Sequence, residues 1–306
     1  MNTISTNKPM LTVFTPAYNR AYSLHLGYES LLRQSCKDFK WLIIDDGSTD
    51  NTEELVKSWI NKDNGFDIQY IYKPNGGMHT AHNTAYENID TELNVCIDSD
   101  DYVADEAIKK ILEFWKKYGN DKFAGIVGLD ATFDNEIIGS KFPDSLKVTT
   151  LSDYYISGGK GDKKLVYRTE VMNKYPPYPV FEGEKYVSLG YKYLLCDQEY
   201  KLLVLNEILC NVEYRNDGSS LNMYKQYLMN PKGFAFIRTV DMKYNKSFFK
   251  NIKTCIHYVS SSLISKNNNY VNESPKKLLT ILMTPFGVCL YLFIKYKTRD
   301  RVRKTI

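Results

Sequence analysis

Short β-prone runs alternate with helical patterns between residues 11 and 128, and this alternation constrains the fold more than any other feature of the sequence. The four runs are LTVFTP, FKWLIID, IQYIY and LNVCID, and helical patterns separate them near residues 21–34, 52–61 and 80–88. Parallel strands need long crossover connections, which helices usually supply. The alternation therefore predicts an α/β domain with a mostly parallel sheet and helices on both faces.

Polar clusters follow each of the four predicted strands. They read PAYNR, DDGSTDNT, KPNGGMHTAHN and DSDD, in chain order. Ligands of parallel sheets bind at the carboxyl ends of the strands, so we expect these clusters to face one crevice. DDGSTDNT has a second explanation, because Ser48, Thr49 or Asp50 can cap the next helix. Capping alone gives no reason for Asp45 and Asp46 together at the end of a buried strand.

The rest of the chain divides into a mixed region and a helical region. From about residue 123 to 211 the pattern is irregular, with Tyr- and Pro-rich pieces such as KYPPYPVFEGEKYV. After residue 214 a turn-rich stretch, RNDGSSLN, leads into largely helical patterns. We therefore expect one domain over residues 1–215 and a helical C-terminal region over residues 216–306.

Positive charge is concentrated at the C-terminus. The formal net charge is +4, but residues 276–306 hold eight Lys or Arg and one acid, so this stretch alone carries +7 and the rest −3. A nucleic-acid binder would show Lys and Arg on a face of its folded domain, which this distribution argues against. It favours contact with an anionic lipid surface.

The compartment is indicated by the cysteines and the N-terminus. The cysteines show no C-x-x-C motif and no metal-ligand spacing, which is typical of a reducing cytosol; they are Cys36, Cys96, Cys196, Cys210, Cys255 and Cys289. The first apolar stretch is cut short by Pro16, so no signal peptide is predicted.

Residues 278–294 form an uncharged run of 17 residues, the lower limit for a helix that crosses a bilayer. Pro285 and Gly287 lie in its middle, and Lys or Arg flanks both ends. The pattern favours a helical hairpin or an interfacial helix on an anionic membrane over a core helix or a bilayer span. We therefore expect residues 278–306 to associate with a membrane. The expected location of the protein is the cytoplasm, bound peripherally to the inner face of the cell membrane.

The motifs TVFTPAYNR, WLIIDDGSTDNT, NGGMHTAHN and VCIDSDDYV, in this order and spacing, resemble those of the inverting glycosyltransferases of family 2 found in bacterial surface-polysaccharide biosynthesis. The resemblance covers roughly residues 10–215. It implies a GT-A fold, which is a Rossmann-like, mostly parallel central sheet flanked by helices. Each motif alone is a weak signal, but four in register are specific.

The carboxylates of DSDD suit the chemistry that the resemblance implies. A nucleotide-sugar donor leaves as a diphosphate, whose developing charge a divalent cation stabilises. Mg²⁺ is commonly held by one or two carboxylates plus substrate phosphates, so a short cluster suffices for Mn²⁺ or Mg²⁺. By the resemblance, Asp100 binds the metal, Asp98 and Ser99 contact the donor, and Asp98 or Asp101 adds a ligand. The alternative is an acidic first turn of a helix beginning near Asp105.

The resemblance also implies a set of donor-binding residues outside DSDD: Thr15, Pro16, Tyr18, Arg20, Asp46, Gly77 and His82. Asp46 is expected to accept from the N3–H of a base, which a uracil presents, so the expected donor is a UDP-sugar. Many relatives carry Arg where His82 stands, which is a departure from the usual pattern. The alternatives are an ordinary packed aromatic for Tyr18, a turn residue for Asp46, and helix packing for His82 and His79.

Inverting transfer needs a general base that deprotonates the acceptor hydroxyl. Similar enzymes carry an acidic residue at a helix start in the place of FEGEKYV, which makes Glu184 the expected base and Glu182 the second choice. Asp197 is a distant third. The alternative is that Glu182 and Glu184 are helix-start acids. In GGKGDKKLVYR, Asp162 either contacts sugar hydroxyls from a mobile loop or lies in a plain surface loop.

The predicted function is inverting transfer of a hexosyl or N-acetylhexosaminyl group from a UDP-sugar to a hydroxyl of a saccharide acceptor, expected to be lipid-linked. Two other functions are weighed against it. A sugar-nucleotide nucleotidyltransferase normally has a Gly-rich loop after its first strand, and TPAYNRAYS has no glycine. A non-catalytic sugar-nucleotide or saccharide-binding protein on the same scaffold has less reason to retain DSDD and a spaced acid.

Overall fold

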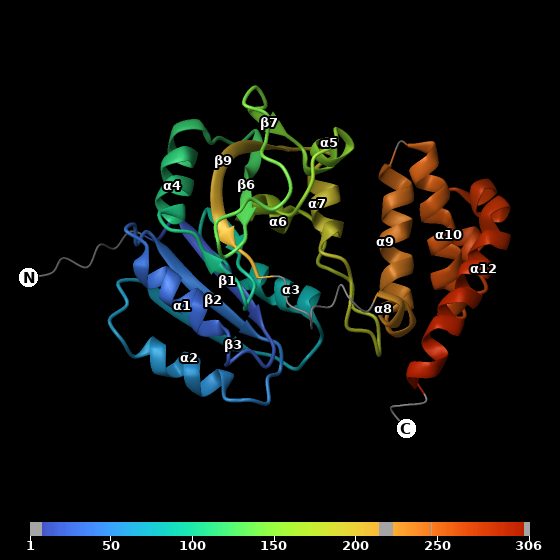
Figure 1. Ribbon diagram of the computed structural model, residues 1–306, viewed down its shortest axis with the longest axis horizontal. Helices are drawn as coiled ribbons and strands as arrows, with labels where there is room; N and C mark the ends of the chain where they lie inside the picture. Colours follow the sequence, from blue (N-terminus) through green and yellow to red (C-terminus); the bar gives the residue numbers. More distant parts are fainter. Residues whose placement is uncertain (1–7, 214–222, 246, 303–306) are drawn as a thin grey trace, which may run out of the picture. The chain divides into compact units, whose positions relative to one another are not determined.

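The computed structural model describes residues 8–213, 223–245 and 247–302, which form two compact units (Figure 1). Unit 1 ends at Pro177 and takes in Leu195–Glu213 as well. Unit 2 combines Tyr178–Leu194 with the chain from Tyr214 onward. The division expected from the sequence differs in one respect, because residues 178–194 pack with the C-terminal helices and not with the sheet.

Unit 1 is built on one nine-stranded sheet with the order β3-β2-β1-β4-β8-β6-β9-β5, and β7 pairs with β9. Strands β1 to β4 are parallel, whereas β8 runs antiparallel between β4 and β6. The strand bounds are β1 Leu11–Ala17, β2 Phe39–Asp45, β3 Asp67–Tyr72, β4 Leu93–Cys96, β5 Tyr102–Val103, β6 Phe123–Ala131, β7 Val148–Thr149, β8 Lys163–Arg168 and β9 Lys201–Asn211. The predicted α/β class, with parallel strands in the N-terminal part, is confirmed.

Helices α1 and α2 cover one face of the sheet. Val13 and Trp41 are paired in register, so they point to the same face, and Trp41 stacks on Trp59 of α2 at 5.8 Å. Tyr28 of α1 stacks on Trp59 at 4.3 Å, nearly coplanar. The helix bounds in unit 1 are α1 Leu24–Arg33, α2 Thr52–Ile60, α3 Met78–Asn88, α4 Ala107–Tyr118, α5 Leu151–Ile156 and α6 Thr169–Lys174, and α7, Gly190–Cys196, lies at the border with unit 2.

Helix α3 covers the opposite face. Phe14 follows Val13 in β1 and therefore points the other way, and its ring lies 5.0 Å from His82 and 5.7 Å from Tyr86, both on α3. Helices lie on both faces, as the sequence predicts, and they bury all of β1 and most of β2 and β4. Near-continuous apolar runs such as WLII follow from this double burial.

The parallel pairing brings the four strand ends to one edge of the sheet. Ala17 is paired with Asp45, and Asp45 with Tyr72, so β1, β2 and β3 end level with one another. Cys96, the last residue of β4, is paired with Phe14 of β1. The loops that follow these strands therefore start side by side.

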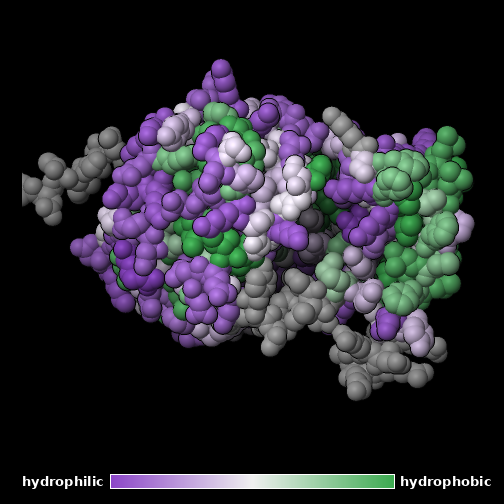
Figure 2. All heavy atoms as spheres, turned by 45° about the horizontal axis from the view of Figure 1, so that its top comes forward, coloured by the Kyte–Doolittle hydropathy of each residue, from purple (hydrophilic) through white to green (hydrophobic). Residues whose placement is uncertain are grey.

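Unit 2 is helical. Its helices are α8 Met223–Met229, α9 Pro231–Tyr244, α10 Phe248–Ile264, α11 Tyr270–Glu273 and α12 Lys277–Val302. Helices α9 and α12 both pack against α10, around a small core of Met242, Cys255 and Tyr258. Helix α12 is one continuous helix with Pro285 inside it, which differs from the hairpin alternative. Figure 2 shows hydrophobic residues gathered over this part of unit 2, at the right of the view.

Candidate active site

The loops after β1 and β2 are bonded to each other. The backbone N–H of Asn19 donates to Ser48 Oγ at 2.8 Å, and the N–H of Thr49 donates to Asn19 Oδ1 at 2.7 Å. Asn19 has a left-handed backbone with φ of 52°, which Asn tolerates better than most residues. The two polar clusters PAYNR and DDGS therefore form one surface.

Only part of the first motif is open to a ligand. Thr15 is buried and its hydroxyl accepts from the Trp41 indole N–H at 3.0 Å, and Pro16 is buried within β1. Tyr18 is exposed, and the half-buried Arg20 donates to the Tyr22 hydroxyl at 2.8 Å. Tyr18 and Arg20 are thus placed to meet a ligand, whereas Thr15 and Pro16 support the strand end behind them.

Asp46 organises the loop that follows β3. Its Oδ1 accepts from Lys73 Nζ at 2.5 Å and from the Gly76 N–H at 3.0 Å, and its Oδ2 accepts from the Gly77 N–H at 2.7 Å. The Asp46 carbonyl also accepts from the Asn75 side-chain amide at 2.7 Å. A carboxylate has about four lone-pair positions, so Oδ2 keeps acceptor capacity for one further donor.

Asp45 and Gly47 shape the turn after β2 and its contact with the loop after β3. Asp45 accepts from the Ser48 N–H at 2.7 Å and from the Tyr70 hydroxyl at 2.5 Å, which closes the turn. Gly47 has φ of +83°, and a Cβ there would lie 2.6 Å from the backbone nitrogen of Asn75. Close approach of two backbones explains why the motif has glycine at this position.

The two histidines of NGGMHTAHN are buried. His82, expected to face the donor, is 0% exposed; its Nε2 lies 3.6 Å from Cys96 Sγ and its ring packs on Phe14. This arrangement is the helix-packing alternative. His79 is also buried, and neither ring nitrogen has a hydrogen-bond partner among the described residues. Burial lowers the pKa of His79 to about 4, although the nearby Asp46 opposes the shift.

The DSDD segment forms a turn between β4 and β5. The N–H of Asp101 donates to the Asp98 carbonyl at 3.0 Å, and the buried Ser99 accepts through its carbonyl from Ser23 Oγ at 2.9 Å. Asp98 and Asp100 are half-buried, whereas Asp101 is buried. The turn therefore offers two partly exposed carboxylates and one that points inward.

A buried lysine and a further aspartate lie behind DSDD, and sequence reasoning did not identify them. Lys164 Nζ lies 3.7 Å from Asp130 Oδ1 and donates to the Cys96 carbonyl at 3.4 Å. Both side chains are nearly buried, 12% and 4% exposed. Lys164 is the second residue of β8 and Asp130 the second-last of β6, so the antiparallel insertion of β8 between β4 and β6 brings them to DSDD. The signal in the sequence that could have identified Lys164 is the pair of adjacent lysines in GDKKL.

Negative charge outnumbers positive charge in this cluster. Burial alone would lower the pKa of Lys164, but Asp130, Asp101 and Asp98 raise it well above its ordinary value. Burial raises the pKa of Asp101 to about 8, with a further contribution from Asp98 and Asp100 and an opposing one from Lys164. Asp101 is therefore the carboxylate of this turn that gives up its proton least readily when no cation is bound.

The donor set fits a cation that shares its ligands with a substrate. Within residues 8–213, 223–245 and 247–302, no group of three or more His, Cys, Asp or Glu side chains could hold a metal by itself. Asp98 and Asp100 supply two partly exposed carboxylates in one turn. Such a pair suits Mg²⁺ or Mn²⁺ completed by phosphate oxygens and water, and not a closed protein cage.

Glu184 belongs to unit 2, where its carboxylate caps a helix. Glu184 Oε1 accepts from the Lys232 N–H at 2.9 Å and Oε2 from the Gly233 N–H at 2.8 Å, both in the first turn of α9. The Lys185 N–H donates in return to Asn230 Oδ1 at 2.8 Å. These bonds satisfy N–H groups that have no partner inside the helix. They give Glu184 a structural role whether or not it meets a substrate.

The other two candidate bases differ from each other. Asp197 accepts from the N–H and hydroxyl of Ser152 at 2.8 and 2.6 Å, and so caps α5; burial raises its pKa. Glu182 is exposed, and its carboxylate has no hydrogen bond or ion pair with any residue that the structure describes. Of the three carboxylates, Glu182 alone is not committed to a helix end.

The Gly-rich loop between α5 and β8 is held from inside. Lys163 is buried, and its Nζ donates to the carbonyls of Lys160 at 2.8 Å, Asp162 at 3.1 Å and Ile138 at 3.2 Å. Gly161 has φ of +75°, and a Cβ there would lie 2.3 Å from the Ile138 carbonyl oxygen. The loop is therefore a fixed surface, and Asp162 is near enough to raise the pKa of Asp130.

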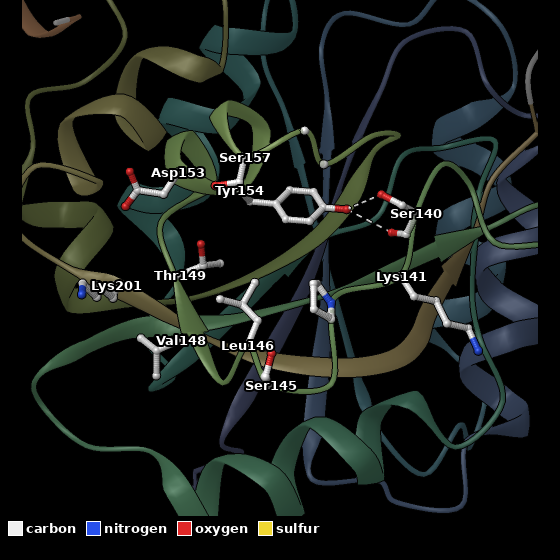
Figure 3. A pocket seen from close by; sticks show the side chains of 13 residues that line it. Ser140, Lys141, Ser145, Leu146, Val148, Thr149, Asp153, Tyr154, Ser157 and Lys201 are labelled. Carbon is white, nitrogen blue, oxygen red and sulfur yellow. Dashed lines mark hydrogen bonds between the residues drawn. The ribbon is translucent and has the colours of Figure 1, made fainter.

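A pocket of about 610 Å³ lies beside α5 (Figure 3). Tyr154 projects across it, and its hydroxyl makes hydrogen bonds of 3.0 Å with both the side chain and the carbonyl of Ser140. Thr149 and Lys201, which also line the pocket, lie where β9 begins. The site residues predicted from the sequence are not part of its lining.

Comparison with known families decides what kind of site this is. The model of "Glycosyl transferase family 2" matches residues 12–174, more than half of the chain. The chain belongs to glycosyl transferase family 2. All the residues assembled at the strand ends, from Thr15 to Lys164, lie within this match.

Curated relatives of this family 2 glycosyltransferase match in part. An uncharacterized glycosyltransferase of Haemophilus influenzae is 31% identical over 40% of this chain and 51% of its own length. The putative teichuronic acid biosynthesis glycosyltransferase TuaG of Bacillus subtilis is 32% identical over 35% of this chain and 42% of its own. The chondroitin synthase of Pasteurella multocida is 33% identical over 36% of this chain and 11% of its own length. The chain thus spans about half or less of these relatives.

Solved structures share the GT-A fold. S. aureus TarS in complex with UDP-GlcNAc superimposes with a TM-score of 0.61 at 17% identity, over 95% of this chain and 91% of that one. The mannosyltransferase PcManGT of Pyrobaculum calidifontis, in complex with GDP-Man and Mn²⁺, superimposes with a TM-score of 0.54 at 13% identity. The superposition covers 92% of this chain and 86% of that one. The expected fold and family are thereby confirmed.

We predict that His79 makes the family 2 glycosyltransferase less stable in acid. The pKa of His79 is about 4 in the folded protein against about 6.5 unfolded, so below pH 6.5 the unfolded state binds a proton that the folded state refuses. The free energy of unfolding should fall by about 2 kcal/mol between pH 7.5 and pH 5 on this account. Urea unfolding of His79→Gln should show a smaller fall than the wild type. Substitution of the exposed His25 is the control, and an equal fall in both variants would contradict the prediction.

We also predict that the Glu184 carboxylate stabilises α9. Glu184→Ala removes two acceptors of first-turn N–H groups and should lower the free energy of unfolding by about 1 kcal/mol. Glu182→Ala, two residues away and exposed, is the matched control and should change it by less than about 0.5 kcal/mol. Urea denaturation followed by circular dichroism measures both. Equal effects of the two substitutions would mean that the cap is not formed.

Proposed function

We propose that this protein is an inverting glycosyltransferase that moves a sugar from a UDP-sugar to a hydroxyl of a saccharide acceptor with the help of a divalent metal. The observation that carries the proposal is the meeting of DSDD with the loops after β1 and β2 at one sheet edge, within the family 2 fold. Each of these loops supplies a different part of what a nucleotide sugar needs. Nothing in the pocket of Figure 3 offers the same combination.

Asp100 and Asp98 would hold the metal, since they are the partly exposed carboxylates of the turn. A bound Mn²⁺ or Mg²⁺ neutralises the charge that develops on the leaving diphosphate. Lys164 and Asp130 support the turn from behind, because Lys164 bonds the Cys96 carbonyl at its start. Asp101, buried and with a raised pKa, is better suited to hold the turn than to bind the metal.

A uracil base is favoured by the acceptor that Asp46 has left. Its Oδ2 accepts one loop N–H and can take a second donor, and the N3–H of uracil is such a donor. The exposed ring of Tyr18 beside it offers a stacking surface. TarS is known in complex with UDP and with UDP-GlcNAc, whereas PcManGT is known with GDP-Man, so the base is tested directly below.

The general base is assigned to FEGEKYV. Position in the motif favours Glu184, which is the first choice, and Glu182 is the second. The contacts alter the weight of this choice, because both carboxylate oxygens of Glu184 already accept backbone N–H groups of α9, which fix the side chain at the start of that helix. The exposed Glu182 has no such constraint. Separate substitutions decide between them.

The acceptor is proposed to be a growing saccharide carried by a lipid at the inner face of the cell membrane. Relatives named for teichuronic acid biosynthesis and for chondroitin synthesis support a surface polysaccharide. The apolar and basic C-terminal helix supports a membrane-bound acceptor. A hexosyl or N-acetylhexosaminyl group is the proposed cargo.

A non-catalytic sugar-nucleotide or saccharide-binding protein on the same scaffold is the second candidate. The observation in its favour is that two of the three candidate bases, Glu184 and Asp197, are occupied as helix caps. Such a protein would bind the nucleotide sugar and release it unchanged. The two experiments that follow separate donor binding from transfer.

We predict that UDP, but not GDP or CMP, stabilises the protein, and only with Mn²⁺ present. Near a hundredfold excess over its Kd, UDP should raise the Tm by about 5 °C, because a ligand that binds only the folded state adds stability by mass action. EDTA and Asp100→Ala should each abolish the shift. A shift with GDP alone would assign a different base, and no shift with any nucleotide would overturn the donor assignment.

We predict that transfer depends on one glutamate of FEGEKYV. Loss of a general base typically costs about 10²- to 10⁴-fold in rate, so the correct one of Glu184→Gln and Glu182→Gln should lose activity by that factor and keep its UDP-dependent Tm shift. Release of UDP from a UDP-sugar, with saccharide and membrane-lipid acceptors, measures the rate. The other variant is the matched control. Full activity in both variants would place the base elsewhere, and no turnover by the wild type would favour the binding protein.

A further inference from the structure

Helix α12 buries few of its large apolar side chains. Its buried positions among the described residues are Thr280, Gly287, Ile294 and Thr298, and of these Ile294 alone is large and apolar. The opposite side carries large apolar residues that are open to solvent, at the three- and four-residue spacing of one helix face. A helix of a water-soluble domain normally does the reverse.

The exposed side is called the apolar face here and is defined by Phe248, Leu278, Ile281, Leu282, Leu292 and Tyr296. Phe248 comes from α10 and is 64% exposed, and the other five come from α12, with Leu278 at 79%. Phe248 lines one groove of about 580 Å³ together with Leu278. The start of α10 and the start of α12 therefore form one continuous surface, which the sequence pattern of residues 278–294 did not include.

The apolar face is bordered by positive charge. Lys276 and Lys277 stand at its start, and Lys295 and Lys297 at its end. Lys295 Nζ lies 4.5 Å from the centre of the Tyr291 ring, so its stem runs along an aromatic surface while its charge stays in water. By sequence, arginines 299, 301 and 303 and Lys304 follow. An apolar stripe with cations at both ends is complementary to an anionic lipid surface.

We propose that the apolar face is seated in the interface of an anionic lipid bilayer, with α12 lying in the plane of the membrane. This inference goes beyond the proposed glycosyl transfer and does not depend on it. The partner is the bilayer itself, and the contact joins Phe248 of α10 to the exposed side of α12. A helix of this kind buries its apolar side about 5–10 Å into the headgroup boundary.

Packing within unit 2 favours an in-plane helix over a bilayer span. Lys277–Thr298 is 22 residues long with a mean hydropathy of 1.9, so length and composition permit either arrangement. A Cβ on Gly287 would lie 2.5 Å from Val259, which shows how closely α12 and α10 approach. If α12 spanned the bilayer, it would have to separate from α10 or carry Lys250 and Lys253 of α10 into the hydrocarbon. An in-plane α12 keeps every contact.

Depth at Cys289 distinguishes the two arrangements. Cys289 is exposed on α12, whereas Cys196, Cys210 and Cys255 are buried. It lies near the middle of the 22-residue stretch, so a span would put it at the bilayer centre, about 15 Å deep. We would label Cys289 with an environment-sensitive fluorophore in the full chain carrying Cys36→Ser, and add vesicles of phosphatidylglycerol and phosphatidylcholine with spin labels at shallow or deep positions.

An in-plane helix predicts a blue shift with anionic vesicles and stronger quenching by the shallow spin label. Stronger quenching by the deep label would overturn the proposal in favour of a span, and no blue shift would overturn membrane contact altogether. Pure phosphatidylcholine vesicles should bind at least about tenfold more weakly, since the flanking lysines contribute only on an anionic surface.

Vesicle flotation of variants tests the extent of the face. Phe248→Ser and Leu282→Ser should each weaken binding by about tenfold, and Ile156→Ser, an equally exposed apolar position in unit 1, should leave it unchanged. Unchanged binding of Phe248→Ser would limit the contact to α12 and overturn the in-plane surface. Concentration-dependent dimers without lipid, lost in the same two variants, would make the face an interface between copies of the chain and would also overturn the proposal.

Discussion

The carboxylate of Asp46 is the interaction on which the strand-end surface depends. It receives the backbone N–H groups of Gly76 and Gly77 and the ammonium of Lys73, so one buried side chain fixes the loop after β3 against the turn after β2. Hydrogen bonds to a charged acceptor are stronger than neutral ones, and the burial of Asp46 makes each of them costly to lose. A glycine at position 47 is required by the same close approach.

A second constraint is the balance of buried charge behind DSDD. Asp98, Asp100 and Asp101 share one turn, and Asp130 lies near them, so their mutual repulsion must be offset. Lys164 supplies one positive charge inside the cluster, while burial and the neighbouring carboxylates raise the pKa of Asp101. A cation arriving with a diphosphate would enter a region already organised around negative charge. A region that receives a cation can contain several carboxylates even if only some of them bind the cation directly.

Helix ends and helix faces account for the other part of the molecule. Glu184 and Asp197 cap the first turns of α9 and α5, where N–H groups without a partner inside the helix attract a carboxylate regardless of any chemistry. Helix α12 packs through Thr280 and Gly287 and leaves Leu278, Leu282 and Phe286 exposed. In both arrangements the neighbours of a residue determine whether its side chain stabilises the fold or stays accessible to a binding partner.

The sequence by itself determined the α/β class, the four parallel strands and the family, because alternating periodicity and motifs at strand ends are local properties of the chain. It also located Tyr18, Asp46 and the DSDD turn at one edge. Only the tertiary structure decided that His82 is buried under Phe14, that Glu184 caps α9, and that Lys164 and Asp130 join DSDD. These outcomes depend on which strand inserts beside β4 and which helix starts beside FEGEKYV. Such pairings join residues far apart in the chain, and no local pattern encodes them.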